Sequence, residues 1–345
     1  MSERARLTKV GWEEDLTYER SDATPADPAG NQVLIEVEAC GVCFRDCIDR
    51  SGRFKFIQTP ITPGHEAVGR VVAVGPDVTD WSVGDRVATT HRDFCGNCVA
   101  CQRESGSLCQ GATGVLGLLI DGGYASHLMA PERCFYAMDQ GIPATEAAVL
   151  HCTFGTSYRG LARFGGVGSG QQVLVTGANG GVGSAAVQVA SRLGATVTAV
   201  TRDERHAEYL TKLGAQHVIV DAGDRFHKEL SAGPVDVVMD CVGPPTFNSS
   251  LRSLRPGGKM IVVGNVVEER ASVNLGFVVT RGLQIIGSSG ATRADMRAVL
   301  ELHAEKPFSI EIHEKLDLEQ ADRAQRMVQA GGLHGRIVLV PKQGS

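Results

Sequence analysis

The stretch QQVLVTGANGGVGSAAVQVASRLG, residues 171–194, decides the fold of this 345-residue chain. An apolar run at 173–175 has the length of a buried parallel strand, and apolar residues recur at helical spacing from 185 to 193. Between them lies a turn in which glycines are spaced GxxGxxG. A strand, a glycine turn and a helix begin a dinucleotide-binding unit, because small residues let a pyrophosphate approach the helix N-terminus. The spacing departs from GxGxxG, so an ordinary tight turn is the alternative.

The next predicted strand ends where the two nicotinamide cofactors would be distinguished. Roughly 20 residues after the glycine turn, an NAD site has an acid for the ribose 2′-hydroxyl, and an NADP site has a basic group. Thr201 occupies this position and Arg202 follows it. The pattern favours NADP(H), with NAD(H) as the alternative. Asp203 could cap the following helix instead, and Arg202 could be a solvated charge at the helix entry.

Strands and helices alternate from about residue 154 to 287, which predicts a doubly wound parallel sheet. The predicted strands are 172–176, 196–201, 217–220, 235–239, 259–263 and 283–287, with helices near 182–193, 203–213 and 245–254. Residues 1–153 are rich in β patterns and in Gly and Pro turns, with no helical periodicity before about 145. Residues 288–345, with a helix at 294–303 and a strand at 336–340, are expected to return to this first domain.

Composition excludes several classes of protein. The length predicts two domains, and 43% hydrophobic with 21% charged residues is typical of a soluble globular protein. A net charge of −5 gives no basic field for nucleic acid. The first twenty residues are charged, and no run approaches the roughly 18 apolar residues of a membrane span. We therefore expect a cytoplasmic protein whose ten cysteines serve metal binding or catalysis rather than disulfides.

Four cysteines form a compact motif, C-x2-C-x2-C-x7-C, within about 91–111. They are Cys95, Cys98, Cys101 and Cys109. Four thiolates complete a tetrahedral shell and leave no position for a substrate, which indicates a structural zinc ion. An iron–sulfur cluster is the alternative, but the wide last gap and the lack of a neighbouring Cys-Pro argue against it.

Three other segments could together form an open metal site. They are Cys40-Gly-Val-Cys43, Gly64-His65-Glu66 and His151-Cys152. Two thiolates and one imidazole with a fourth open position are a catalytic zinc arrangement, for which alcohol dehydrogenase is the standard example. Spacing alone cannot join segments so far apart, and a single His or Cys is more often packed without function.

These motifs together resemble the zinc-containing medium-chain dehydrogenase/reductase family over nearly the whole chain. The matching segments are CGVCFRD at 40–46, GHEAVG at 64–69, WSVGDRV at 81–87, the four-cysteine motif and TGANGGVG at 176–183. The resemblance implies an α/β protein with a GroES-like β-rich catalytic domain and a Rossmann cofactor domain at 154–287. It also implies two zinc ions per subunit and a homodimer or homotetramer.

The resemblance assigns residues to the catalytic centre and to the cofactor site. It implies that Cys43, His65 and Cys152 bind the catalytic zinc, that Asp46 orients His65, and that Glu66 can enter the metal shell. The cofactor residues are Thr156, Gly177, Asn179, Gly180, Gly181, Val182, Gly183, Thr201, Arg202, Gly264, Asn265, Val266 and Ser288.

One departure from the alcohol dehydrogenases concerns proton transfer. After the zinc cysteine they often have His or Arg and then a hydroxyl residue that begins a proton relay, whereas this chain has Phe44 and Arg45. Arg45 is a poor general base, so it either holds an anionic group or pairs with a nearby carboxylate. His151 is an alternative proton carrier. The motif around Arg45, together with residues 264–266 and 274–276, resembles acryloyl-CoA reductase-type members, which reduce an activated C=C bond with NADPH.

Three hypotheses follow. The first is a zinc-dependent, NADP(H)-preferring oxidoreductase of an alcohol and its aldehyde or ketone, with zinc polarising the oxygen while the nicotinamide transfers hydride. The second is an enoyl reductase of an acryloyl-CoA-like thioester. The third is a non-catalytic nucleotide-binding protein that retains the fold.

Overall fold

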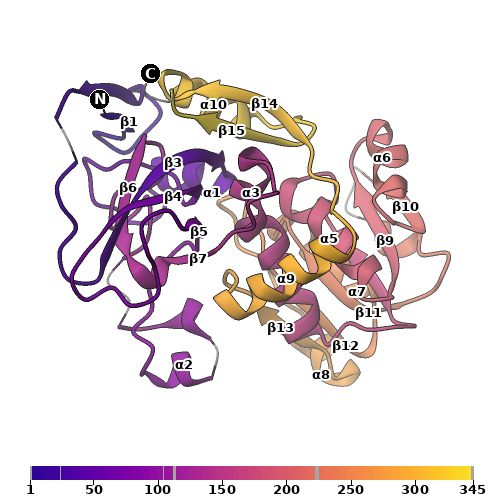
Figure 1. Ribbon diagram of the computed structural model, residues 1–345. Coiled ribbons are helices and arrows are strands. Elements are labelled where there is room, and N and C mark those ends of the chain that lie inside the picture. Colours follow the sequence, from indigo (N-terminus) through magenta and orange to yellow (C-terminus); the bar gives the residue numbers. More distant parts are fainter. Residues whose placement is uncertain (1, 24, 104, 112–113, 222–224, 343–345) are drawn as a thin grey trace. The chain divides into compact units, whose positions relative to one another are not determined.

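The computed structural model in Figure 1 describes residues 2–23, 25–103, 105–111, 114–221 and 225–342. The chain forms two compact units, each described here by itself. Unit 1 comprises Met1–Cys152, Thr292–Met296 and Ile310–Ser345, and unit 2 comprises Thr153–Ala291 and Arg297–Ser309. Residues 297–309 therefore pack within unit 2, whereas the whole of 288–345 was expected to complete the first domain.

Unit 2 is built on a six-stranded parallel sheet with the order β10-β9-β8-β11-β12-β13. This is the 3-2-1-4-5-6 order of the Rossmann fold, so the predicted doubly wound architecture is confirmed. The strands are short apolar runs, as expected where both faces of a parallel sheet are covered. They are β8 Gln172–Val175, β9 Thr196–Thr201, β10 His217–Val220, β11 Val235–Asp240, β12 Leu254–Val262 and β13 Gln284–Gly287.

Helices connect the strands of unit 2, and apolar strand residues such as Leu174, Val238 and Met260 lie in its core. The helix predicted at 203–213 divides into a 3-10 turn at Glu204–His206 and a shorter α-helix, because Asp203 caps the turn first. The helices are α4 Thr156–Tyr158, α5 Gly181–Arg192, α6 Ala207–Lys212, α7 Pro244–Ser253, α8 Leu275–Arg281 and α9 Arg293–Glu305.

Unit 1 is built on a seven-stranded, mostly antiparallel sheet with the order β14-β15-β3-β4-β5-β7, in which β6 also pairs with β3. A separate hairpin of β1 and β2 lies at the N-terminal end of the chain. The strands are β1 Ser2–Arg6, β2 Thr17–Ser21, β3 Gln32–Val42, β4 Glu66–Val74, β5 Arg86–Thr89, β6 His127–Pro131, β7 Phe135–Ala137, β14 Ile312–Asp317 and β15 Arg336–Val340.

The main correction in unit 1 is a helix that the sequence did not predict. No helix was expected before about residue 145, yet α1 spans Phe44–Arg50 and carries buried Asp46, Cys47 and Asp49. Seven residues are too few to show a helical period, and Phe, Asp and Cys are weak helix formers, so tertiary packing determines this helix. The other helices of unit 1 are α2 Val99–Gln102, α3 Ala144–Leu150 and α10 Ala321–Ala330.

None of the helices formed by the described residues has the length and apolar character needed to span a bilayer.

A fully buried arginine at the end of α1 ties that helix to two distant segments. The Arg50 guanidinium lies 2.6 Å from the Asp322 carboxylate and donates to the carbonyl of Glu14 at 2.7 Å. It also donates to the Gln325 side chain and lies 4.3 Å from the Trp12 ring centroid. These contacts fix α1 against α10 and the N-terminal segment.

We predict that Arg50→Met destabilises the protein by about 3 kcal/mol, because the Glu14 carbonyl and the Gln325 side chain lose their buried donor and Asp322 keeps only its ion pair with Arg326. Arg4→Met is the matched control, since its pair with Glu19 is exposed and should contribute less than about 1 kcal/mol. The midpoint of urea unfolding measures both variants. Equal shifts in the two variants would contradict the role of Arg50.

Candidate metal centre and cofactor site

The strand register of unit 1 brings two distant sequence motifs to one place. Strands β3 and β4 pair antiparallel, with Gly41 opposite Glu66. Cys43 directly follows β3 and His65 directly precedes β4, so both side chains lie at the same end of this pair. Strand β15 pairs with the other edge of β3, with Ile337 opposite Val42, which brings residue 336 to the same end.

The fourth member of the group comes from the helix that covers these strands. Cys152 lies just after α3, and its sulfur is 3.7 Å from the sulfur of Cys43. One donor atom each of Cys43, His65, Glu66 and Cys152 lies within 4.8 Å of the others. Two thiolates at 2.3 Å from a tetrahedral zinc ion would be about 3.8 Å apart, so the sulfur spacing fits zinc.

Two buried polar atoms of this group have no protein partner among the described residues. They are Nε2 of His65 and Oε1 of Glu66, which lie 4.0 Å apart. Burial of such atoms without compensation is unfavourable, and a cation at this position would satisfy both. A donor set of two thiolates, an imidazole and a carboxylate fits zinc.

Asp46, on the first turn of α1, fixes the geometry of the group. Its carboxylate lies 2.9 Å from Nδ1 of His65 and accepts hydrogen bonds from the Cys43 amide at 3.0 Å and the Tyr124 hydroxyl at 2.9 Å. A proton held on Nδ1 leaves Nε2 as the metal-binding nitrogen. The structure therefore places Asp46 where it can orient His65, the role that the resemblance implied.

Arg336 is a site residue that sequence reasoning missed. Its guanidinium lies 2.5 Å from the Glu66 carboxylate and donates to the carbonyl of Val42 at 3.0 Å. Gly41 makes room for this arrangement, because a Cβ at that position would lie 2.1 Å from Glu66 Oε2. Arg336 begins the strand predicted at 336–340, but only the pairing of β15 with β3 reveals its proximity to Glu66.

The pKa shifts of the group show strong coupling between neighbouring charges. The hydrogen bond from Cys152 holds the pKa of Cys43 well below its ordinary value, and the same contact raises the pKa of Cys152. Burial raises the pKa of Glu66 to about 7, opposed by Arg336. Burial and Arg45 lower the pKa of His65, but Asp46 and Cys43 outweigh them and raise it to about 10. A bound metal ion would displace the protons from the thiols and from Nε2.

The structure gives the two residues after Cys43 no part in a proton relay. Arg45 forms an ion pair with Asp49 at 2.7 Å and donates to the carbonyl of Leu116 at 2.8 Å. Of the two alternatives for Arg45, pairing with a nearby carboxylate is the one observed. Phe44 carries no hydroxyl.

A cluster of rings lies beside Cys152. The His151 ring lies 5.8 Å from the His91 ring and 6.1 Å from the Tyr136 ring, measured between centroids. Burial and the neighbouring His151 hold the pKa of His91 well below its ordinary value, so His91 is neutral at pH 7. His151, the alternative proton carrier, thus lies among rings rather than in solvent.

The four cysteines of the predicted structural site also converge. Cys95, Cys98, Cys101 and Cys109 have neighbouring sulfur distances of 3.4–3.9 Å, close to the about 3.8 Å expected around tetrahedral zinc. The guanidinium of Arg92 donates a hydrogen bond to the Cys109 carbonyl and so stabilises the loop around the four cysteines.

The glycine turn of unit 2 has the backbone that pyrophosphate binding requires. Gly177 adopts φ +57°, and a Cβ on Gly183 would lie 2.2 Å from the Gly177 carbonyl oxygen. Gly180 is the N-cap of α5, so the free amides of Gly181 and Val182 begin the helix. These conformations exclude larger side chains at the two positions.

The end of β9 presents a cation rather than an acid. Buried Thr201 donates its hydroxyl to the Asn179 side chain at 3.2 Å and accepts from the amide of Asp203 at 3.3 Å, which links this loop to the glycine turn. Arg202 is exposed and has no hydrogen bond or ion pair within the described part of the chain. The Asp203 carboxylate forms an ion pair with the Arg205 guanidinium.

Most of the remaining predicted cofactor residues of unit 2 follow the carboxyl ends of its strands. Gly264 and Val266 follow β12, and a Cβ on Gly264 would lie 1.9 Å from the Cys241 carbonyl oxygen. Ser288 follows β13, and its hydroxyl is buried without a partner among the described residues. Asn265 lies between Gly264 and Val266, and Thr156 begins α4.

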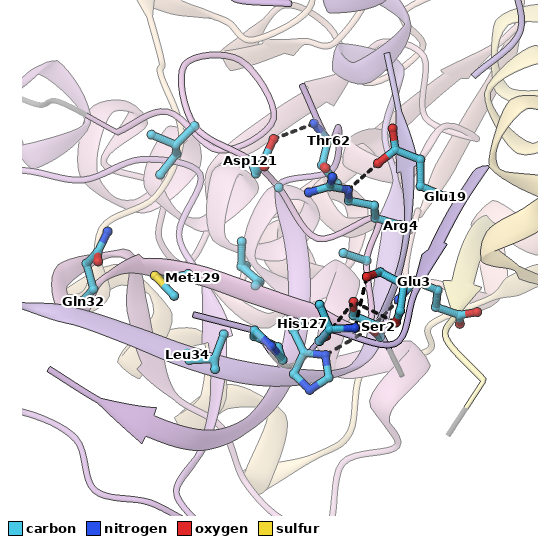
Figure 2. A pocket seen from close by; sticks show the side chains of 18 of the residues that line it. Ser2, Glu3, Arg4, Glu19, Gln32, Leu34, Thr62, Asp121, His127 and Met129 are labelled. Carbon is cyan, nitrogen blue, oxygen red and sulfur yellow. Dashed lines mark hydrogen bonds and ion pairs between the residues drawn. The ribbon is translucent and has the colours of Figure 1, made fainter. Parts of the chain in front are cut away.

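A cavity of about 1150 Å³ lies elsewhere in unit 1, and Figure 2 shows it. It is lined by parts of β1, β2, β3 and β6, and no side chain of the metal group lines it. Two of its charged residues, Arg4 and Glu19, pair at 2.7 Å, and none of its described lining residues has a buried polar side-chain atom without a partner. This cavity therefore lacks the unpaired buried donors of the metal group.

Comparisons with known proteins agree with this geometry. Residues 29–140 match the alcohol dehydrogenase GroES-like domain, and residues 181–305 match the zinc-binding dehydrogenase domain. The chain is 33% identical over 326 residues to an acryloyl-coenzyme A reductase of Sulfurisphaera tokodaii, covering 94% of this chain and 96% of the relative. It is 33% identical over 313 residues to an alcohol dehydrogenase of Geobacillus stearothermophilus, covering 89% and 91%.

A solved structure is also similar over its full length. The cobalt- and zinc-bound thermostable alcohol dehydrogenase from Pyrobaculum aerophilum has a TM-score of 0.88 and 28% identity, covering 99% of both chains. The chain belongs to the zinc-containing medium-chain dehydrogenase/reductase family. It is an oxidoreductase of the alcohol dehydrogenase and acryloyl-CoA reductase type, so the hypothesis of a non-catalytic nucleotide-binding protein is excluded.

We predict that Asp46→Asn weakens metal binding at the Cys43 group about ten- to a hundredfold, because the amide no longer fixes the His65 ring. Zinc retention against a graded chelator measures the effect. Asp49→Asn is the matched control, since Asp49 is a buried acid of the same helix that contacts Arg45 instead. Equal metal loss in both variants would mean that the effect is a general disruption of α1.

Proposed function

We propose that this protein is a zinc-dependent, NADP(H)-preferring reductase of an activated C=C bond conjugated to a carbonyl, as in an acryloyl-CoA-like thioester. One observation carries the choice: the donor set for a carbonyl-polarising metal is complete, while Arg45 is held by Asp49 and no hydroxyl follows Cys43. Oxidation of an alcohol needs a path for the hydroxyl proton out of a buried site, whereas reduction of a conjugated C=C bond does not begin at an O–H group.

In this proposal Cys43, His65 and Cys152 hold a catalytic zinc ion, and the four cysteines of the 91–111 segment hold a structural one. When bound, zinc polarises the substrate carbonyl, NADPH supplies the hydride to the β carbon, and the α carbon takes its proton from water. Asp46 orients the imidazole, and Arg336 holds Glu66 beside the metal position. The chain thus supplies a largely buried donor set that includes one carboxylate, Glu66.

A second candidate is the interconversion of an alcohol and its aldehyde or ketone. The complete donor set serves a simple carbonyl equally well, and the Geobacillus stearothermophilus relative is named an alcohol dehydrogenase. The relative from Sulfurisphaera tokodaii, named an acryloyl-coenzyme A reductase, covers more of this chain. That relationship and the missing relay hydroxyl support our choice of the enoyl thioester as the first candidate.

The substrate test compares matched compounds. We predict that acryloyl-CoA and crotonyl-CoA oxidise NADPH and give the saturated thioesters, while crotonaldehyde, butanal and 1-butanol react at least about a hundredfold more slowly in kcat/KM, a difference of about 3 kcal/mol. Product analysis by mass spectrometry identifies the bond that is reduced. Faster turnover of the aldehydes to alcohols would contradict the enoyl proposal and favour the second candidate.

The control for this test separates the two metal positions. Cys43→Ala should abolish reduction and lower zinc from about two to about one ion per chain, because the four-cysteine site is complete without it. Cys43→Ala protein that retained full activity would contradict the role of the metal in either reaction.

The NADP(H) preference rests on the loop after β9. Arg202 is exposed beside the end of the strand with no partner in the described part of the chain, and the position expected to carry an acid in an NAD site is Thr201. A guanidinium suits a ribose 2′-phosphate because it can donate two hydrogen bonds to it.

We predict that Arg202→Ala raises the dissociation constant of NADPH about ten- to a hundredfold and changes that of NADH less than about twofold, because only NADPH has the phosphate. Isothermal titration calorimetry measures both constants. A similar loss for both cofactors would show that Arg202 does not read the phosphate.

We further propose that the protein self-associates through unit 2. Helix α8 exposes Leu275 at 71% and Val279 at 77%, one helical turn apart on the same face. The neighbouring edge strand β13 exposes Ile285 at 40%. An apolar helix face beside an unpaired strand edge fits a second copy of the same chain, which would bury both.

The ten unpaired thiols fit the cytoplasm, which thiol titration of freshly lysed cells would check.

We predict that Leu275→Glu/Val279→Glu lowers the molar mass in solution to that of one chain, because two buried carboxylates oppose an apolar interface. Light scattering after size exclusion measures the mass. Leu108→Glu, on an exposed residue of unit 1, is the control and should leave the mass unchanged. An unchanged mass in the double variant would place the interface elsewhere.

A further inference from the structure

An ion pair beside the cofactor-selecting position engages the Asp203 carboxylate, which is the acid nearest to Arg202 in the sequence. Both carboxylate oxygens of Asp203 accept from the same residue: Oδ1 from the Arg205 backbone amide at 2.9 Å, and Oδ2 from the Arg205 guanidinium at 2.8 and 2.5 Å. The contact with Arg205 holds the pKa of Asp203 at about 2, so this carboxylate is ionised and engaged at pH 7.

The position of Asp203 in the chain explains why its ion pair with Arg205 can affect the choice of cofactor. Asp203 follows Arg202 directly, and its amide is bound to the Thr201 hydroxyl, so the carboxylate is attached to a fixed backbone at the end of β9. A free carboxylate here would accept from a ribose 2′-hydroxyl, as the acid of an NAD site does. It would also repel a 2′-phosphate and compete with that phosphate for Arg202.

We propose that Arg205 is a specificity-determining residue that favours NADPH by engaging the Asp203 carboxylate, without binding the 2′-phosphate itself. The proposal rests on the NADP(H) preference proposed above. Arg202 supplies the attraction for the phosphate, and the pair of Arg205 with Asp203 removes the feature that would favour NADH. The two arginines therefore act in different ways. Arg202 attracts the 2′-phosphate, and Arg205 reduces the repulsion between that phosphate and the Asp203 carboxylate.

Direct binding of the phosphate by Arg205 is the competing explanation. The Arg205 side chain is 85% exposed, so exposure alone does not exclude it. The two explanations differ in what happens when Asp203 is also changed. If Arg205 acts on the carboxylate, its loss matters only while the carboxylate is present, whereas loss of a direct phosphate contact does not depend on Asp203.

The test is a double-mutant cycle on cofactor binding, which does not depend on knowing the substrate. The dissociation constants of NADPH and NADH are measured by calorimetry for the wild type, Arg205→Ala, Asp203→Asn and the double variant. We expect Arg205→Ala to lower the preference for NADPH about three- to tenfold, the range for one charge at an exposed position, and the double variant to return within about twofold of the wild type.

Two control variants each remove one exposed charge without changing the Asp203 carboxylate. Lys212→Ala removes another exposed cation that pairs with an acid, Glu208, and Glu204→Gln removes the exposed acid next to Asp203. Both should leave the preference within about twofold of the wild type, since neither changes the Asp203 carboxylate. A shift of the same size in either control would overturn the proposal, because it would show a general field effect.

The outcomes separate this proposal from the one on which it rests. A wild type that binds NADH more tightly would refute the NADP(H) preference and, with it, the role of Arg205. A wild type that prefers NADPH, with a double variant as impaired as Arg205→Ala, would leave the preference intact and overturn the proposal in favour of direct phosphate binding. An unchanged preference in Arg205→Ala would overturn it as well.

Discussion

The antiparallel register of β3 and β4 is the constraint on which the metal centre depends. It sets the end of one strand beside the start of the other, and so places Cys43 next to His65 although 21 positions separate them in the chain. The Asp46 carboxylate then fixes this relation with one hydrogen bond to each of three groups: the imidazole, the Cys43 amide and the Tyr124 hydroxyl. A shift of one residue in the register would turn these side chains to the other face of the sheet.

Each buried carboxylate of the metal centre has one positively charged neighbour. Asp46 and Glu66 are both buried, and each has its own positive neighbour: His65 for Asp46 and Arg336 for Glu66. Within the predicted donor set, Nε2 of His65 and Oε1 of Glu66 have no partner among the described residues. The centre is therefore arranged for an additional cation, which is the physical reason for treating it as a metal site rather than as an ion-pair network.

The sequence predicted much of the fold because its signals are local. Glycine spacing, short apolar runs and the four-cysteine motif each lie within about 25 residues, and the structure has the six strands of unit 2 in the Rossmann order. The α1 helix and Arg336 were missed for the opposite reason. Helix α1 is too short for a period, and the proximity of Arg336 to Glu66 depends on pairing between strands nearly 300 residues apart. The pairing of Arg205 with Asp203 was also missed, because a charge pair two residues apart in a loop has no distinctive pattern.

The most direct test of the account is a crystal structure of the zinc-loaded protein with NADPH, with anomalous data recorded at the zinc absorption edge. The account predicts a peak bonded to both sulfurs of Cys43 and Cys152 at about 2.3 Å and to Nε2 of His65 at about 2.0 Å, with the fourth position held by water, substrate or the exchangeable Glu66. No peak among these three side chains, or an ion permanently enclosed by four protein ligands in every state of the protein, would contradict it.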